Sequence, residues 1–600
     1  MKIYLIAPLN ERGSKTTFPL GIASISAALK AAGHEVKAVN LALCEDDTGE
    51  VLAEIRDFKP DFVGIGGLTP SFAQIRRVHA AMKHEHPNLP TVLGGGVLTS
   101  AAEIVFEDIK PDYGVIGEGE VTIVELAEQL ENGRAPLDVN GLILRGVDGS
   151  LIRTQARTPL PDLNVLPMPD YEGLGYAKLR EMGIYLEILG SRGCPYSCTF
   201  CYSPLGRRYR QRSLDHLFRE IEHVVKTYDI KSLGITDELF AITPERVKEF
   251  CDRIAPLGVN WITQLRVDSV DEDTLRLMRD SGCVMISYGL ESMHQDVLKS
   301  MNKKTTPAKI ERTLELTYDA GMSSFGNFIF GDPAETPLTA EATMDWWFNN
   351  RKHLINLGSL QCWPGSKIYK DAVRNGIIAN ELEFIAEGCP DINLTSMPEH
   401  DYWKMLRRAH LYNNALLFPC RVLEVNPDGP GAWSLSTVCP HCTKEKTYNQ
   451  ITNHNVPFNR STVRLWCECG RMFDLPVLVP LPEHPRELLD EVARLGRLAA
   501  AGDQDALGRL EALGSEHLRL ANARYMAAKA HWAAGVVDKA YLFTAKGLIA
   551  DPTFPGLHEL MALVLTAMDE PGIARVFHEQ ASRLRDNQPP GWVSPLMADL

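Results

Sequence analysis

Three cysteines stand close together in the stretch Leu189-Gly190-Ser191-Arg192-Gly193-Cys194-Pro195-Tyr196-Ser197-Cys198-Thr199-Phe200-Cys201-Tyr202. They are spaced C-x3-C-x2-C and follow an apolar run, 184–189, which predicts a short buried strand. The thiols therefore belong to the loop just beyond the end of a strand. Three thiolates in one tight loop suit a metal cluster.

Iron–sulfur clusters are held by cysteine thiolates, and a cubane cluster normally takes four. A local set of three, Cys194, Cys198 and Cys201, would leave one iron free to bind another ligand. The alternatives are a zinc knuckle or three unrelated buried cysteines. Three thiols without a fourth nearby ligand make a poor closed zinc site, so the loop favours a cluster with an open iron.

The composition is that of an ordinary globular protein, with 45% apolar and 23% charged residues. A chain of 600 residues exceeds what one hydrophobic core supports, so about three to five domains are expected. The net charge of -15 argues against binding to nucleic acid or to an anionic membrane. No signal peptide and no membrane span are expected. Compact clusters hold 7 of the 13 cysteines, a pattern that predicts metal sites in a reducing cytoplasm.

Residues 1–135 alternate strand-like runs with amphipathic helical runs, which predicts a Rossmann-like α/β domain with a doubly wound parallel sheet. Ligands of such sheets bind beyond the carboxyl ends of the strands, where glycine lets the backbone approach a ligand closely. No turn here has the G-x-G-x-x-G pattern of a dinucleotide site. The glycine-rich turns are Gly66-Gly67-Leu68-Thr69, Gly94-Gly95-Gly96 and Gly117-Glu118-Gly119-Glu120.

Residues 136–182 are predicted to be a linker with one hairpin about Val147-Asp148-Gly149. Residues 183–415 then resume the strand–helix alternation with six units, as in a partial TIM-like (β/α)6 barrel. The active-site residues of such barrels come from the carboxyl ends of the strands. The six strands are expected at 187–189, 232–236, 260–265, 284–289, 324–329 and 356–361.

The cysteine spacing, with Phe200 just before the third cysteine, resembles the radical S-adenosylmethionine (SAM) superfamily. The resemblance implies a [4Fe-4S] cluster on Cys194, Cys198 and Cys201 whose open iron chelates the amino and carboxylate groups of SAM. Polar turns after the later strands resemble further motifs of this superfamily. The SAM-binding residues implied in this way are Thr236, Asp237, Glu238, Arg266, Ser287, Glu291, Asn327 and Gly331.

The run 19–23, the Gly94-Gly95 turn and the segment 115–120 together resemble the cobalamin-binding domain that precedes many radical SAM domains. A D-x-H-x-x-G segment is absent, so cobalt would have no imidazole ligand from that motif. The alternative is a Rossmann-like domain that has lost cobalamin and only mediates packing. The cobalamin-binding residues implied by the resemblance are Pro8, Leu68, Thr69, Gly94, Gly95, Gly96, Gly117, Glu118 and Gly119.

Residues 416–480 hold two more cysteine pairs, Cys439 with Cys442 and Cys467 with Cys469, each at a hairpin-like turn. Four thiolates on two turns predict a zinc ribbon. The second pair is C-x-C where C-x2-C is usual, and His441 could replace one thiol. An auxiliary iron–sulfur cluster is the alternative.

Residues 481–600 are rich in alanine and leucine, and 521–552 resemble a tetratricopeptide unit with Gly535 at the turn between two helices. Such helices often bind a partner or a substrate carrier, although a helical cap on the catalytic core is equally compatible with the pattern.

The resemblance implies that the reduced cluster gives one electron to SAM, producing methionine and a 5′-deoxyadenosyl radical that abstracts hydrogen from the substrate. Methylcobalamin would then deliver a methyl group to an unactivated carbon, which makes a cobalamin-dependent methyltransferase the leading hypothesis. A radical SAM cyclase or rearrangement enzyme without methyl transfer is the alternative. A non-catalytic scaffold is a third hypothesis, and the three-cysteine motif disfavours it. The resemblance also implies an electron donor such as flavodoxin or ferredoxin, while the sequence identifies neither the substrate nor a catalytic side chain.

Overall fold

The structure is a computed structural model that describes residues 1–9, 18–182, 184–204, 206–240, 243–416, 420–429, 432–452, 462–476, 486–517 and 520–586. The chain divides into two compact units. The first unit contains Met1–Thr343 and Ser359–Tyr402, and the second contains Met344–Gly358 and Trp403–Leu600. The boundary expected between residues 480 and 481 and the chain end beyond 586 lie outside the described residues.

The first sheet has the strand order β2-β1-β3-β4-β5-β6-β7. Its first five strands run parallel, and the β6–β7 hairpin pairs antiparallel with β5. The hairpin expected in the linker therefore extends this sheet. The strands are β1 (Lys2–Ala7), β2 (Glu35–Asn40), β3 (Phe62–Gly66), β4 (Thr91–Gly94), β5 (Tyr113–Val115), β6 (Leu142–Arg145) and β7 (Leu151–Arg153).

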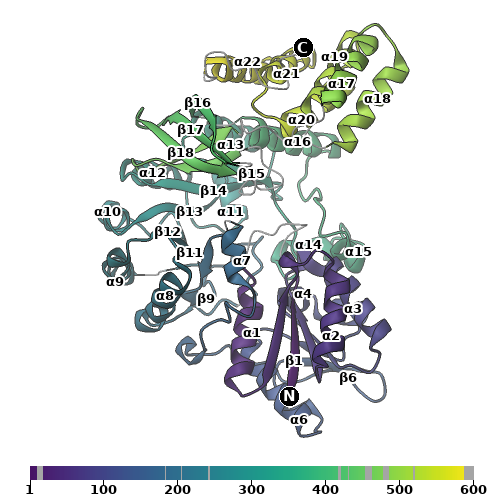
Figure 1. Cartoon of the computed structure of the whole chain (residues 1–600), viewed down its shortest axis with the longest axis vertical. Helices are drawn as coiled ribbons and strands as arrows, with labels where there is room; N and C mark the ends of the chain where they lie inside the picture. Colours follow the sequence, from purple (N-terminus) through teal and green to yellow (C-terminus); the bar gives the residue numbers. More distant parts are fainter. Residues whose placement is uncertain are drawn as a thin grey trace. The chain divides into compact units, whose positions relative to one another are not determined.

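Helices cover both faces of the first sheet, as the alternation of side chains along β1 requires (Figure 1). Ile3 and Leu5 pack in a core cluster with residues of α1 and α6. Tyr4 and Ile6 pack on the other face with residues of α2, α3 and α5. The domain is therefore doubly wound. Its helices are α1 (Leu20–Ala31), α2 (Asp47–Phe58), α3 (Phe72–Glu85), α4 (Gly96–Ser100), α5 (Ala102–Ile109) and α6 (Glu120–Glu131).

The second sheet has the strand order β15-β14-β13-β12-β11-β8, so each strand lies next to its predecessor in the chain. Successive parallel strands added in one direction place the connecting helices on one face, as in a partial barrel. The strands are β8 (Leu186–Ile188), β11 (Ser232–Ile235), β12 (Asn260–Leu265), β13 (Cys283–Glu291), β14 (Ser323–Phe330) and β15 (Leu354–Ser359). The helices of this part of the chain are α7 (Tyr176–Glu181), α8 (Leu214–Tyr228), α9 (Pro244–Ile254), α10 (Glu272–Asp280), α11 (Gln295–Ser300), α12 (Pro307–Asp319), α13 (Pro337–Asn349), α14 (Lys367–Arg374) and α15 (Glu381–Ala386). Of these, α15 packs with α3 and α5 in the core of the first sheet.

The second unit contains a small antiparallel β region and a set of helices. Three strands pair in the order β16-β17-β18, and β19 pairs with β20. The strands are β16 (Arg421–Pro427), β17 (Ala432–Val438), β18 (Glu445–Thr452), β19 (Thr462–Trp466) and β20 (Met472–Pro476). The helices that follow α16 (Glu399–Ala415) and these strands are α17 (Arg486–Ala500), α18 (Gln504–Glu516), α19 (Ala521–Ala533), α20 (Val537–Ala550), α21 (Pro555–Ala567) and α22 (Pro571–Asp586). Gly535 has a φ of +73° at the α19–α20 turn.

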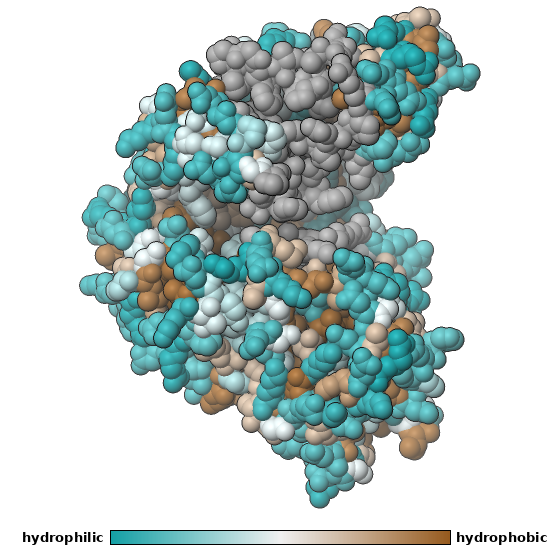
Figure 2. All heavy atoms as spheres, viewed as in Figure 1, coloured by the Kyte–Doolittle hydropathy of each residue, from teal (hydrophilic) through white to brown (hydrophobic). Residues whose placement is uncertain are grey.

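Hydrophobic residues on the face shown in Figure 2 form small, separate patches among hydrophilic ones. Isolated exposed apolar side chains such as Val147 and Leu338 are ordinary for a protein surface. Within the described residues, no helix combines the length and the apolar character needed to cross a membrane.

Candidate active site

The three cysteines of the first set lie in the loop between two short antiparallel strands, β9 (Ser191–Arg192) and β10 (Arg210–Gln211), just after β8. Gly193 has a φ of +80°, and a Cβ there would lie 2.5 Å from the carbonyl oxygen of Arg208. Only glycine fits this close approach. Cys198 is buried, Cys194 is half-buried and Cys201 is exposed. The loop thus presents its thiols at the carboxyl end of a strand, as the sequence predicts.

The environment of Cys198 and Cys201 disfavours the charged thiolate unless a cation is present. Desolvation by the neighbouring protein atoms raises the pKa of Cys201 to about 11, even though part of the residue reaches solvent, and the nearby Glu238 carboxylate raises it further. Burial also raises the pKa of Cys198, whereas the positive charge of Lys303 lowers it. Metal binding to such thiols would displace their protons. The loop therefore has the donor atoms for a cluster with an open iron, and the three cysteines fit the cofactor that the sequence predicts.

Asp237 and Glu238 follow β11, but their side chains do different things. Asp237 is fully buried and accepts hydrogen bonds from the Gly190 N–H at 2.7 Å and the Ser191 Oγ–H at 2.8 Å. Burial raises the pKa of Asp237 to about 6. Glu238 accepts from the hydroxyl of Ser203, two residues beyond Cys201, at 3.0 Å. Asp237 thus anchors the start of the cysteine loop, whereas Glu238 lies beside its end.

Arg266 and Glu291 lie at the ends of β12 and β13. The Arg266 guanidinium bonds to Asp268 at 2.9 Å and stacks 3.8 Å above the ring centroid of Tyr196, inside the cysteine loop. Glu291 has a left-handed φ of +68°, and its Oε1 lies 2.6 Å from Nζ of Lys303. Lys303 is a neighbour that the sequence analysis missed.

Ser287 and Asn327 stand on the adjacent strands β13 and β14, while Gly331 follows β14 with a φ of +113° against the ring of Tyr402. Thr236 borders a large cavity. The structure thus places Thr236, Asp237, Glu238, Arg266, Glu291 and Gly331 at the carboxyl ends of neighbouring strands, whereas Ser287 and Asn327 lie within β13 and β14. Their assignment to SAM stays a prediction.

A cavity of about 410 Å³ opens at the carboxyl ends of the first sheet. The turns around it approach each other closely, because a Cβ at Gly95 would lie 2.6 Å from the carbonyl oxygen of Gly67. Side chains there would fill the space that a ligand needs. The predicted residues that line it are Pro8, Leu68, Gly94, Gly95, Gly96, Gly117, Glu118 and Gly119. Thr69 is not among its lining residues and is buried. The glycine turns fit a large, close-lying cofactor such as cobalamin.

The same cavity is also lined by Arg192 and Pro204, which flank the three cysteines, and by Thr236 at the end of β11. Tyr202 connects the two regions directly. Tyr202 directly follows Cys201, and its hydroxyl donates to the carbonyl oxygen of Gly96 at 3.4 Å. Its ring packs so closely on Gly365 that a Cβ at Gly365 would lie 2.5 Å from it. Residues next to the cysteines therefore line part of the glycine-rich cavity.

Glu118 lines the cavity, yet its carboxylate is already engaged with arginines of β9 and β10. Its two oxygens accept from Arg210 at 2.8 Å, and Arg192 lies 3.4 Å away. Arg192 also pairs with Glu120 at 2.5 Å. These side chains are at most 12% exposed. Glu118 thus ties the first domain to the strands that frame the cysteine loop.

Replacing Glu118 with alanine should lower the free energy of unfolding by about 3–5 kcal/mol, because the buried guanidinium of Arg210 loses both of its bonds to Glu118. Denaturant titration would measure it. The matched control is Glu107→Ala, which breaks the exposed Arg145 pair and should cost about 1 kcal/mol or less. Equal effects of the two substitutions would contradict this structural role of Glu118.

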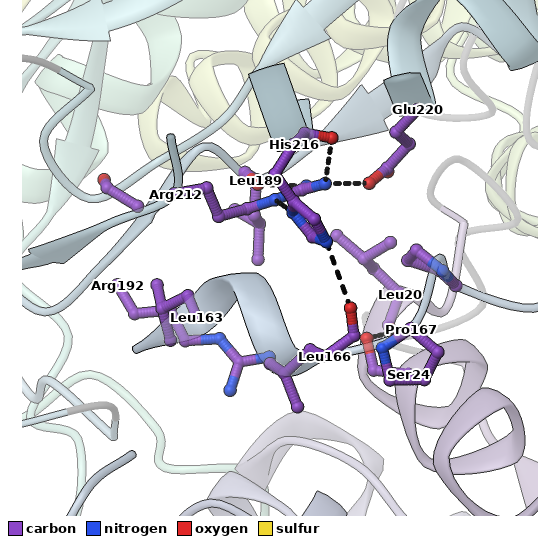
Figure 3. A pocket seen from close by; sticks show the side chains of 12 residues that line it. Leu20, Ser24, Leu163, Leu166, Pro167, Leu189, Arg192, Arg212, His216 and Glu220 are labelled. Atoms are coloured by element: carbon purple, nitrogen blue, oxygen red, sulfur yellow. Dashed lines mark hydrogen bonds and ion pairs between the residues drawn. The ribbon is translucent and has the colours of Figure 1, made fainter. Parts of the chain in front are cut away.

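A polar side chamber of about 40 Å³ adjoins the large cavity and shares Leu20, Ser24 and Arg192 with its lining (Figure 3). Arg212 donates to Nδ1 of His216 at 2.8 Å and pairs with Glu220 at 2.7 Å. The volume is enough for about three water molecules. The chamber is too small for a substrate.

The second set of cysteines lies in the second unit, at the turns between β17 and β18 and between β19 and β20. The Sγ atoms of Cys439, Cys442, Cys467 and Cys469 all lie within 4.8 Å of one another. Two of their separations are 3.5 and 3.9 Å, close to the ~3.8 Å of thiolates around one tetrahedral zinc ion. His441 instead bonds through Nε2 to the carbonyl oxygen of Met472 at 2.8 Å. The four thiols lie close enough together to bind a single metal ion.

Comparison with known families and proteins agrees with this architecture. The B12 binding domain family matches residues 10–127, and the Radical SAM superfamily matches residues 188–346. An uncharacterized methyltransferase of Pyrococcus horikoshii is 28% identical over 426 residues, which cover 68% of this chain and 92% of that protein. The anaerobic magnesium-protoporphyrin IX monomethyl ester cyclase of Rubrivivax gelatinosus is 31% identical over 369 residues, which cover 59% of this chain and 66% of the cyclase.

Two solved structures share the fold. The radical SAM methyltransferase TsrM of Kitasatospora setae, with cobalamin and a [4Fe-4S] cluster bound, aligns with a TM-score of 0.54 at 20% identity, covering 62% of this chain and 75% of TsrM. The cobalamin-dependent radical SAM enzyme OxsB aligns with a TM-score of 0.53 at 15% identity, and the alignment covers 98% of this chain and 84% of OxsB. At these identities the similarity establishes the fold.

Proposed function

We propose that this chain, which joins a B12-binding domain to a radical SAM domain, is a cobalamin-dependent methyltransferase that acts on an unactivated carbon. One observation carries the proposal: a single cavity is lined both by the glycine turns of the B12-binding domain and by residues that flank the cysteine loop. A methyl donor and a radical source would face a common space there. The methyltransferase of Pyrococcus horikoshii, which this chain matches over 92% of its length, supports the same reaction class.

In this proposal the [4Fe-4S] cluster and SAM would supply a 5′-deoxyadenosyl radical and cobalamin the methyl group. Cys194, Cys198 and Cys201 would hold the cluster. Asp237 would fix the start of their loop through Gly190 and Ser191. Tyr202 would exclude water between the loop and the cavity.

The predicted SAM-binding and cobalamin-binding residues, and the expected domain limits, belong to the proposal. Radical SAM enzymes need an external reductant, and we propose a flavodoxin or a ferredoxin in the cytoplasm, where thiols stay reduced. We also propose structural zinc at the second set of cysteines and tetratricopeptide-like helices that bind a partner or carrier.

A radical SAM cyclase is the second candidate, because the relative from Rubrivivax gelatinosus, at 31% identity, is named a cyclase. The discriminating experiment incubates reconstituted protein anaerobically with a low-potential reductant, cobalamin and SAM labelled in its methyl group. A methyltransferase should label the cobalamin and release S-adenosylhomocysteine. Formation of 5′-deoxyadenosine without any label on cobalamin would favour the cyclase.

A further inference from the structure

The segment 301–303, which follows α11, contacts the cysteine loop on both sides of Cys198. The Asn302 side chain donates to the carbonyl oxygen and the hydroxyl of Ser197 at 3.0 and 2.8 Å. The backbone N–H of Thr199 donates to the carbonyl oxygen of Met301 at 3.0 Å. Asn302 adopts a left-handed φ of +53°. The residues before and after Cys198 are thus held by a segment about a hundred positions away in the chain.

Lys303, the last residue of this segment, is buried beside the cysteines. Its side chain is 10% exposed, and Nζ lies 2.6 Å from the Glu291 carboxylate and 6.0 Å from the ring centroid of Phe200. A Cβ at Gly289 would lie 2.5 Å from that same Nζ. The end of β13 therefore leaves space for the ammonium group and supplies its carboxylate partner.

The charges that face Lys303 come from three elements. Glu291 ends β13, Arg266 follows β12, and Cys198 lies in the loop. Arg266 in turn pairs with Asp268. The two cations and two carboxylates of this group balance, so the group is neutral, and Glu238 adds a further carboxylate beside Cys201. Loss of the lysine charge would leave the group with a net negative charge beside Cys198.

We propose that Lys303 is a positioning residue that raises the reduction potential of the cluster by holding a buried positive charge next to Cys198. The inference rests on the proposed function, because it requires a cluster on the three cysteines. A cluster held by thiolates becomes more negative when it accepts an electron from an external one-electron donor. A nearby fixed cation stabilises the reduced form more than the oxidised form. Burial keeps salt from screening that effect.

The test is a potentiometric titration of the reconstituted cluster without SAM or cobalamin, followed by electron paramagnetic resonance. Lys303→Gln should lower the potential, so that at the wild-type midpoint the ratio of reduced to oxidised cluster falls about tenfold, which is 59 mV for a one-electron couple. Lys303→Arg keeps the charge and should stay within about twofold of wild type. Lys304→Gln, at the exposed neighbouring lysine, should leave the potential unchanged.

A wild-type potential in Lys303→Gln, or an equal shift in Lys303→Arg, would overturn the inference. If Lys303→Gln does not retain a cluster, Glu291→Gln supplies the opposite test, because removal of the carboxylate charge should raise the potential. If the reduction potential of Glu291→Gln does not rise, the inference is also overturned. Failure of the wild-type chain to bind any iron would instead refute the proposed function, so the two failures are distinguishable.

Discussion

Alanine at Cys198 is expected to abolish the broad visible absorption of anaerobically reconstituted protein and to reduce SAM cleavage to background, a loss of about a thousandfold or more. Cys198 is the middle one of the three cysteines proposed as ligands and the most buried of them. Two remaining thiolates cannot hold a cubane whose open iron is also exposed to SAM. Iron analysis, the visible spectrum and 5′-deoxyadenosine formation measure the effect.

The control for this substitution is Cys283→Ala. Cys283 is fully buried but begins β13, at the opposite end of the strand from Glu291. Removal of its side chain should lower the stability of the protein, because packing around β13 is lost, but should leave the iron content and the visible spectrum unchanged. Retention of four irons per chain in Cys198→Ala, or loss of iron in Cys283→Ala, would contradict the assignment of the cluster to residues 194–201.

The sequence predicts the parts of this site whose signal is local. Strand and helix periods place the two sheets, and the cysteine spacing places the loop at the end of β8. The glycine turns predict the cavity, because a turn without Cβ atoms leaves space whichever side chains surround it. The β6–β7 hairpin is also local, but its position at the edge of the first sheet depends on pairing with β5.

Side chains that find distant partners are harder to predict. Glu118 lies in a glycine-rich turn that indicates a ligand site, yet its carboxylate meets Arg210, 92 positions later. Lys303 lies in an ordinary polar segment after a short helix, and only the folded chain brings it to Glu291 and the cysteines. Asp237 stands in the expected motif, but its environment turns it inward to Gly190. Charge pairs formed across domains leave no periodic trace in the sequence.

Removal of metal from the second set of cysteines is expected to unfold the small β region of the second unit. Structural zinc contributes about 10–16 kcal/mol in small domains, whereas the core here is small, with Leu435 and Phe473 packed around the thiols and Val422. Cys442→Ser should therefore lose the metal and expose the backbone of β17–β20 to rapid hydrogen exchange. Cys420 is a buried neighbour outside the four-thiol set. Cys420→Ala should therefore keep the metal and keep the backbone of β17–β20 protected from hydrogen exchange.

The identity of the metal is best read in the variant that lacks Cys194, Cys198 and Cys201, since any remaining metal then belongs to the second set. One zinc and no iron per chain is the expected result. Each cysteine of a cubane cluster binds a different iron. The Sγ atoms of those cysteines therefore lie farther apart than the 3.5 and 3.9 Å that separate Sγ atoms here. Four residual irons would therefore require the two turns to move apart, and would replace structural zinc by an auxiliary cluster.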